Sequence, residues 1–89
     1  MDRSTILKAA AEVVVERGKP YGSPRENFER IAQLWNAVLG TETLKEPLCA
    51  SDVGTMMICL KLSRLANTPD HEDSMIDICG YAALMSEVT

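Results

Sequence analysis

Four charged side chains stand in the two most apolar segments of the chain. Lys61 and Arg64 lie three residues apart in the run DVGTMMICLKLSRL. Asp73 and Asp77 lie four residues apart in the run HEDSMIDICGY. A charge in a helix without a clean polar face is expected to be buried, so it needs an opposite charge, a metal ion or a ligand. These residues are the first candidates for a functional site.

Two interpretations of the four charges fit their spacing. Asp73 and Asp77 lie one helical turn apart, so their carboxylates repel each other unless a cation lies beside them. In the first interpretation, Lys61 and Arg64 neutralise these carboxylates across an antiparallel pair of helices. In the second, the carboxylates hold Mg²⁺, which prefers oxygen ligands, while the basic residues bind phosphate oxygens. In both, Arg64 and the two aspartates interrupt apolar stripes and are expected to meet inside the protein.

Four helices are predicted to position these residues, with no strand pattern of any length. They span about residues 4–17, 24–39, 52–66 and 70–87 of a single domain, 1–89. The fold class is therefore all-α and bundle-like. Such a small chain buries only a modest core, and self-association into a homo-oligomer is an expected way to gain stability.

Capping signals mark the ends of these helices. Ser4 is expected to cap the first helix, which should stop at Gly18 before the helix-breaking Pro20. Ser23-Pro24 is a strong second start, with Glu26 closing a capping box. A cap at Ser51 or a neighbouring residue is predicted for the third helix, and a start near Pro69 or Asp70 for the fourth. The second helix should bury the apolar stripe of one face, which consists of Ile31, Leu34, Trp35 and Val38.

Charge and composition exclude several classes of function. The chain has 89 residues, 46% of them apolar, and a net charge of -4 without a basic cluster. Non-specific nucleic-acid binding is therefore not expected, although a small phosphorylated ligand needs only two or three cations. Three cysteines without metal-binding or disulfide spacing indicate a reducing cytoplasm. No secretory signal or membrane span is predicted.

The ordered motifs YGSPRENF, IAQLW, DVGTMMICLKLSRL and HEDSMIDICGYAAL resemble a phage and prophage family known by the domain-of-unknown-function label DUF6378. The resemblance runs from about Ile6 to Leu84. More remotely, the chain is similar to phage nucleotide-modification-associated domains and to the all-α nucleoside-triphosphate pyrophosphohydrolases of the MazG type. The MazG resemblance implies an oligomeric helical bundle with Mg²⁺ held by helix-borne acidic residues.

This resemblance assigns roles to eight residues. It implies a metal site made by two acidic pairs, Glu26 and Glu29 on the second helix and Asp73 and Asp77 on the fourth. It implies phosphate or nucleotide contacts from Lys61, Arg64, Tyr21 and Tyr81. The pattern departs from the MazG type, because Glu26 is also explained as a helix cap and the later pair is spaced by four residues rather than three.

Two functions follow from these expectations, beside a third interpretation in which the chain is a helical oligomerisation domain and its charges are purely structural. The first is Mg²⁺-dependent, pyrophosphohydrolase-like chemistry on a nucleoside triphosphate, for which no catalytic residue is assigned. The second is non-catalytic binding, in which a small phage protein sequesters a nucleotide signal or occludes a host defence protein. The incomplete set of acidic ligands leaves the protein's status as an enzyme open.

Overall fold

The computed structural model describes the backbone of residues 2–88, and the side chains of these residues except those of Lys19 and Tyr21. Its helices are α1 (Arg3–Tyr21), α2 (Pro24–Leu39), α3 (Ala50–Asn67) and α4 (Glu72–Met85). No strand occurs within residues 2–88. The prediction of an all-α protein with four helices is confirmed.

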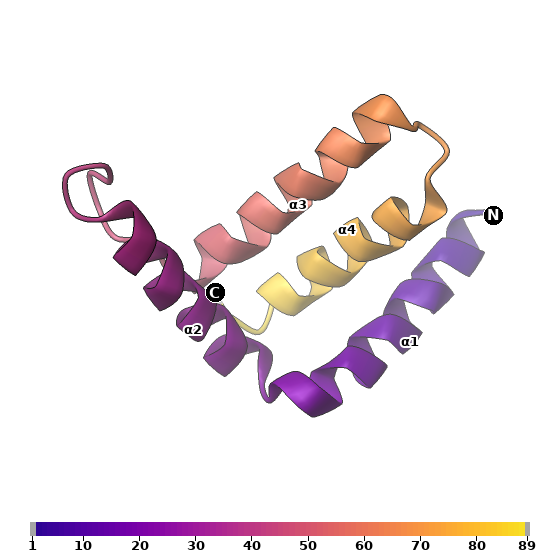
Figure 1. Ribbon diagram of the computed structural model, residues 1–89. Helices are drawn as coiled ribbons and strands as arrows, with labels where there is room; N and C mark the ends of the chain where they lie inside the picture. The colour runs from indigo at the N-terminus through magenta and orange to yellow at the C-terminus, as the bar shows by residue number, and fades with distance from the viewer. Residues whose placement is uncertain (1, 89) are drawn as a thin grey trace.

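Three of the helices lie side by side, and the remaining helix lies across one end of them. In Figure 1, α4 runs between α1 and α3, in the same direction as α1 and opposite to α3. Helix α2 leaves the end of α1 at a wide angle and packs mainly against α3. The molecule is flat as a result, with principal extents of 44 × 30 × 19 Å.

The helix starts follow local capping chemistry, but the predicted cap of α1 is wrong. Asp2 rather than Ser4 caps α1, where its carboxylate accepts the Thr5 N–H at 2.9 Å. This hydrogen bond lowers the pKa of Asp2, because it favours the ionised form. For α2 the predicted cap is confirmed, since Ser23 Oγ accepts the Glu26 N–H at 3.2 Å.

The cap of α3 is Cys49, which lies two residues before Ser51. The Asp52 carboxylate reaches back to accept the Cys49 N–H at 2.9 Å, which lowers the pKa of Asp52. Helix α4 begins after His71, later than predicted, because Thr68 still ends α3. The His71 side chain lies 2.7 Å from Ser74 Oγ, so the hydroxyl of the almost fully buried Ser74 has a partner.

Helix α1 does not stop at Gly18 as predicted but continues through Pro20 to Tyr21. A proline in the last turn of a helix removes one backbone hydrogen bond near an end that frays in any case, so the helix tolerates it there. The chain turns instead at Gly22, whose φ of 78° and ψ of −156° are accessible almost only to glycine. This residue sets the wide angle between α1 and α2.

The core lies where α2 crosses α3 and the carboxyl end of α4. Its buried residues are Phe28, Ala32, Ala50, Val53 and Val88. Only one face of α2 takes part, and the prediction that Leu34 and Val38 are buried is wrong. Leu34 is 61% exposed and Val38 is 85% exposed, because the apolar face of α2 is wider than the surface that α3 offers it.

Gly54 marks the closest approach of the helices in this core. A Cβ atom placed there would collide with the Met85 side chain and would lie 3.3 Å from the Phe28 ring. The absence of a side chain lets α3 and the end of α4 pack closely. Within residues 2–88, none of the helices combines the length and the apolar character that crossing a membrane requires.

Candidate functional site

Asp77 is the centre of a charged group that joins three helices. Its Oδ2 lies 2.8 Å from the Nζ of Lys61 on α3, and its Oδ1 lies 3.3 Å from the Nη1 of Arg17 on α1. The side chains of Lys61 and Asp77 are each only 11% exposed, whereas that of Arg17 is 59% exposed. A single carboxylate on the central helix therefore binds one nearly buried cation and one exposed cation.

Local helix geometry explains why these side chains converge. Lys61 belongs to the inner face of α3, which we define as the buried Val53, Gly54 and Lys61 with the half-buried Met57 and Leu65. Asp77 faces both neighbours because α4 lies between α1 and α3. Two charges are removed from water here, which is tolerable because they pair at hydrogen-bonding distance.

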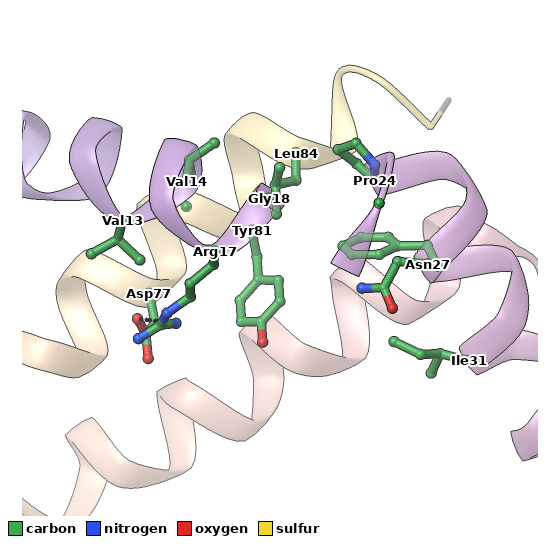
Figure 2. A pocket seen from close by; sticks show the side chains of 13 residues that line it. Val13, Val14, Arg17, Gly18, Pro24, Asn27, Ile31, Asp77, Tyr81 and Leu84 are labelled. Carbon is green, nitrogen blue, oxygen red and sulfur yellow. Dashed lines mark hydrogen bonds and ion pairs between the residues drawn. The ribbon is translucent and has the colours of Figure 1, made fainter. Parts of the chain in front are cut away.

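A pocket of about 350 Å³ lies in the angle between α1 and α2, with α4 along one side. Most of its lining is apolar, and Arg17, Asp77 and Asn27 are its principal polar groups. Figure 2 shows the Arg17–Asp77 contact on one side of the Tyr81 ring and Asn27 with Ile31 on the other. The pocket thus has an apolar wall that ends at a charged pair.

Aromatic and glycine residues give this pocket its shape. The rings of Phe28 and Tyr81 both line it, with centroids 6.4 Å apart and planes tilted by 43°. Gly18 and Gly80 also line it and contribute no side chain. A Cβ atom at Gly18 would meet nothing within 4 Å, so the space beside α1 is open. The cavity has room for a flat apolar group beside the rings.

The expectation that Arg64 meets Asp73 and Asp77 inside the protein is wrong. Arg64 and Asp73 are both exposed, and it is Lys61 that meets Asp77. Arg64 stands in the last turn of α3 and Asp73 in the first turn of α4. The helix ends that flank the α3–α4 connection carry these residues, so neither is covered by a neighbouring helix. The spacing of four residues places Asp73 and Asp77 on the same side of α4, but only Asp77 lies where neighbouring helices cover it.

The remaining predicted site residues are also dispersed. Glu26 and Glu29 are exposed on α2, and Glu29 lies 3.9 Å from Arg25 one turn earlier. Tyr81 lines the pocket, whereas the Tyr21 side chain lies outside the described residues. Within the part of the chain that the structure describes, no three His, Cys, Asp or Glu side chains lie close enough together to hold a metal ion.

Arg17 is the residue of this group that the sequence analysis missed. The predicted first helix, residues 4–17, ends at this residue, and its spacing alone assigns it no role. A signal was nevertheless present, because Arg17 follows Val13 and Val14 by four and three residues and so continues the apolar stripe of α1. A cation that extends an apolar stripe at the end of a helix is a candidate partner for an acidic residue in a neighbouring helix.

The sequence of this all-helical chain matches a described protein family. The model of the family "Domain of unknown function (DUF6378)" matches residues 5–89, and the chain belongs to this family. It is 40% identical to the Gene 55 protein of Mycobacterium phage L5 over 86 residues, which are 94% of this chain and 52% of the relative. It is 36% identical to the Gene 55 protein of Mycobacterium phage D29 over 88 residues, 99% of this chain and 55% of the relative.

The predicted DUF6378 membership is therefore confirmed, and the chain is a small phage-type protein. The chain spans about half the length of the curated relatives it matches. No solved structure matches it.

Proposed function

We propose that this protein binds a small phosphorylated ligand of the nucleotide class in the pocket between α1, α2 and α4. The observation that carries the proposal is the juxtaposition of the Phe28 and Tyr81 rings with the exposed guanidinium of Arg17 in one cavity. A base or another flat ring fits against an aromatic wall. A phosphate group is the natural partner of a guanidinium that presents several N–H donors.

The charge balance of the site supports an anionic ligand. Lys61 and Asp77 neutralise each other at 2.8 Å, which leaves Arg17 as the surplus positive charge of the group. Arg17 contacts Asp77 through one nitrogen at 3.3 Å and is 59% exposed, so its outer N–H groups are accessible from the pocket. An anion placed there gains charge-assisted hydrogen bonds without requiring Asp77 to move.

Binding without hydrolysis is the mode that the positions of the carboxylates support best. The Mg²⁺-dependent reaction implied by the MazG resemblance requires several acidic side chains around one ion. Asp77 instead faces two cations, while Asp73 is exposed on α4 and the pair Glu26 and Glu29 is exposed on α2. We therefore favour a phage-type protein that sequesters a nucleotide signal in the host cell over a pyrophosphohydrolase.

Thermal denaturation with a panel of ribonucleotides, deoxyribonucleotides and cyclic nucleotides, each with and without Mg²⁺, tests this function. A ligand present at about 100 times its Kd stabilises the folded state by roughly 2.7 kcal/mol. For a domain of this size, that stabilisation raises Tm by roughly 10 °C or more. Chromatography of the same mixtures should recover the nucleotide unchanged. A panel without any stabilising member contradicts binding, and release of pyrophosphate contradicts the non-catalytic mode.

Two variants locate the site. Arg17→Met should weaken binding of the stabilising nucleotide about 10- to 100-fold, because it removes a charge-assisted hydrogen bond. Gly18→Leu should fill the open space beside α1 and abolish binding without unfolding the helix. Arg25→Met on the exposed part of α2 is the matched control and should bind like the unaltered protein. If Arg25→Met and Arg17→Met weakened nucleotide binding equally, the ligand would lie outside this pocket.

A further inference from the structure

The chain exposes more surface than a compact monomer of its mass. Its accessible surface is 6251 Å², whereas a typical globular monomer of 9.8 kDa exposes about 5,200 Å². The radius of gyration is 14.2 Å, against about 12 Å expected for a compact domain of this length. About 1,000 Å² of surface is therefore in excess, in a molecule only 19 Å thick.

Part of this surface is a helix face without any charge. We call it the outer face of α3, and it consists of the exposed residues Thr55, Met56, Cys59, Leu60, Leu62, Ser63 and Ala66. The charged residues of α3 border this face or point away from it: Asp52 lies at its amino end and Arg64 at its carboxyl end, while Lys61 points inward. A helix face in water normally carries the charged residues, so this face has the composition of an interface.

The other exposed apolar residues are set among charges. On α1, Leu7 and Val15 have Lys8, Glu12 and Glu16 as exposed neighbours. On α2, Leu34 and Val38 share their side of the helix with the exposed Arg30, and Leu39 stands alone at the end of the helix. Burying the groups on α1 and α2 would desolvate charges within them, whereas the charges that border the outer face of α3 lie only at its two ends, where they can stay in contact with water.

Side-chain size on this face favours packing against another helix. The small residues Cys59 and Ser63 lie near its centre line, with Met56 and Leu60 on one side and Thr55, Ala66 and Leu62 on the other. Small residues at the centre let two helix axes approach to the short end of the usual 8–10 Å range. The larger side chains then interdigitate at both margins.

We propose that the outer face of α3 is the interface with a second copy of this chain. The same patch on both copies meets about a two-fold axis near Cys59, with the two α3 helices antiparallel. The excess surface of two chains totals about 2,000 Å², which lies within the range of homodimer interfaces. The antiparallel arrangement also brings the exposed Arg64 towards the acidic first turn of the partner's α3, so the charges at the margins are complementary.

Sedimentation velocity tests this interface without any ligand, so its outcome is independent of the nucleotide proposal. At about 100 μM, where mass action favours association, the protein should sediment at twice the chain mass of 9.8 kDa. Leu60→Glu should sediment as a helical monomer, because it brings two like charges to a desolvated face. Val38→Glu on α2 is the control and should remain dimeric. A monomeric unaltered protein, or a dimer that only Val38→Glu dissociates, overturns the proposal.

If Leu60→Glu does not fold, the reactivity of the Cys59 thiol tests the interface instead. In the unaltered protein, the Cys59 thiol should react with an aromatic disulfide reagent at least 10-fold more slowly at high protein concentration than after dilution below the dimer Kd. Cys49, which is exposed outside this face, should react at the same rate at both concentrations. Equal reactivity of Cys59 at both concentrations contradicts its burial between two copies.

Discussion

The inner face of α3 carries a charge, and its outer face carries none. Lys61 is nearly buried against α4, while Met56, Leu60 and Leu62 are exposed. A surface helix of a globular protein shows the opposite distribution. The inner charge is satisfied within the chain by Asp77, but nothing among the described residues covers the outer face. Helix α3 therefore has two surfaces of different kinds: the chain itself covers the inner face, and it leaves the outer face exposed.

The largest expected effect concerns the inner face. Lys61→Met should lower the free energy of unfolding by about 3 kcal/mol, because Asp77 then keeps only its longer contact with Arg17. Adding Asp77→Leu should restore most of this loss, since a well-packed apolar pair replaces a buried ion pair with little net cost. Urea denaturation of the two variants measures both steps.

The control for this pair is Arg64→Met, the same type of substitution one turn later. Because Arg64 is exposed, the change should cost less than about 0.5 kcal/mol. Equal costs at Lys61 and Arg64 would break the distinction between the buried and the exposed cation of α3.

A smaller effect is expected from the same substitution at two helical glycines. Gly18→Ala should stabilise the protein by about 0.5–1 kcal/mol, because alanine favours the helix and the new Cβ meets open space. Gly54→Ala on the inner face should instead destabilise it by about 1–3 kcal/mol, because the Cβ collides with Met85. Thermal unfolding of both variants gives the difference. A stabilised Gly54→Ala would show that the inner face is loosely packed.

The smallest effect is pH-dependent and lies at the amino end of α3. The hydrogen bond from the Cys49 N–H lowers the pKa of Asp52 below its ordinary value of 3.8. A depressed pKa contributes stability above the unfolded-state pKa, and this contribution is lost as pH falls through the folded-state value. The unaltered protein should therefore exceed Asp52→Asn in Tm at neutral pH, and the gap should narrow below pH 3.8. Glu42→Gln in the loop before α3 should leave Tm unchanged at either pH.

Helix number and type could be predicted from the sequence because periodicity and capping are local signals. The Ser23-Pro24 start is an example, since the residues that fix it are adjacent in the chain. The end of α1 could not be predicted in the same way. Gly18 and Pro20 are local stop signals, but a helix can absorb both within its last turn.

The candidate site was predictable only in part, because the burial of a charged side chain depends on how the helices pack against one another. The pattern of charges in apolar segments correctly indicated that Asp77 and Lys61 are nearly buried. The same pattern failed for Arg64 and Asp73, which lie at helix ends where neighbouring helices no longer cover them. The pocket itself depends on the angle at Gly22, and no periodicity in the sequence encodes that angle.

The position of α4 between α1 and α3 has a consequence for the order in which the molecule assembles. Helices α3 and α4 are consecutive in the sequence, so their contact closes only a short loop. Helices α1 and α4 are separated by α2 and α3, so their contact closes a loop that contains most of the chain. Contacts of short sequence separation form at a lower loop-closure entropy. We therefore expect the Lys61–Asp77 pair to form early and the contact of Arg17 with Asp77 to form late. The pocket would then be the last part of the molecule to acquire its native shape.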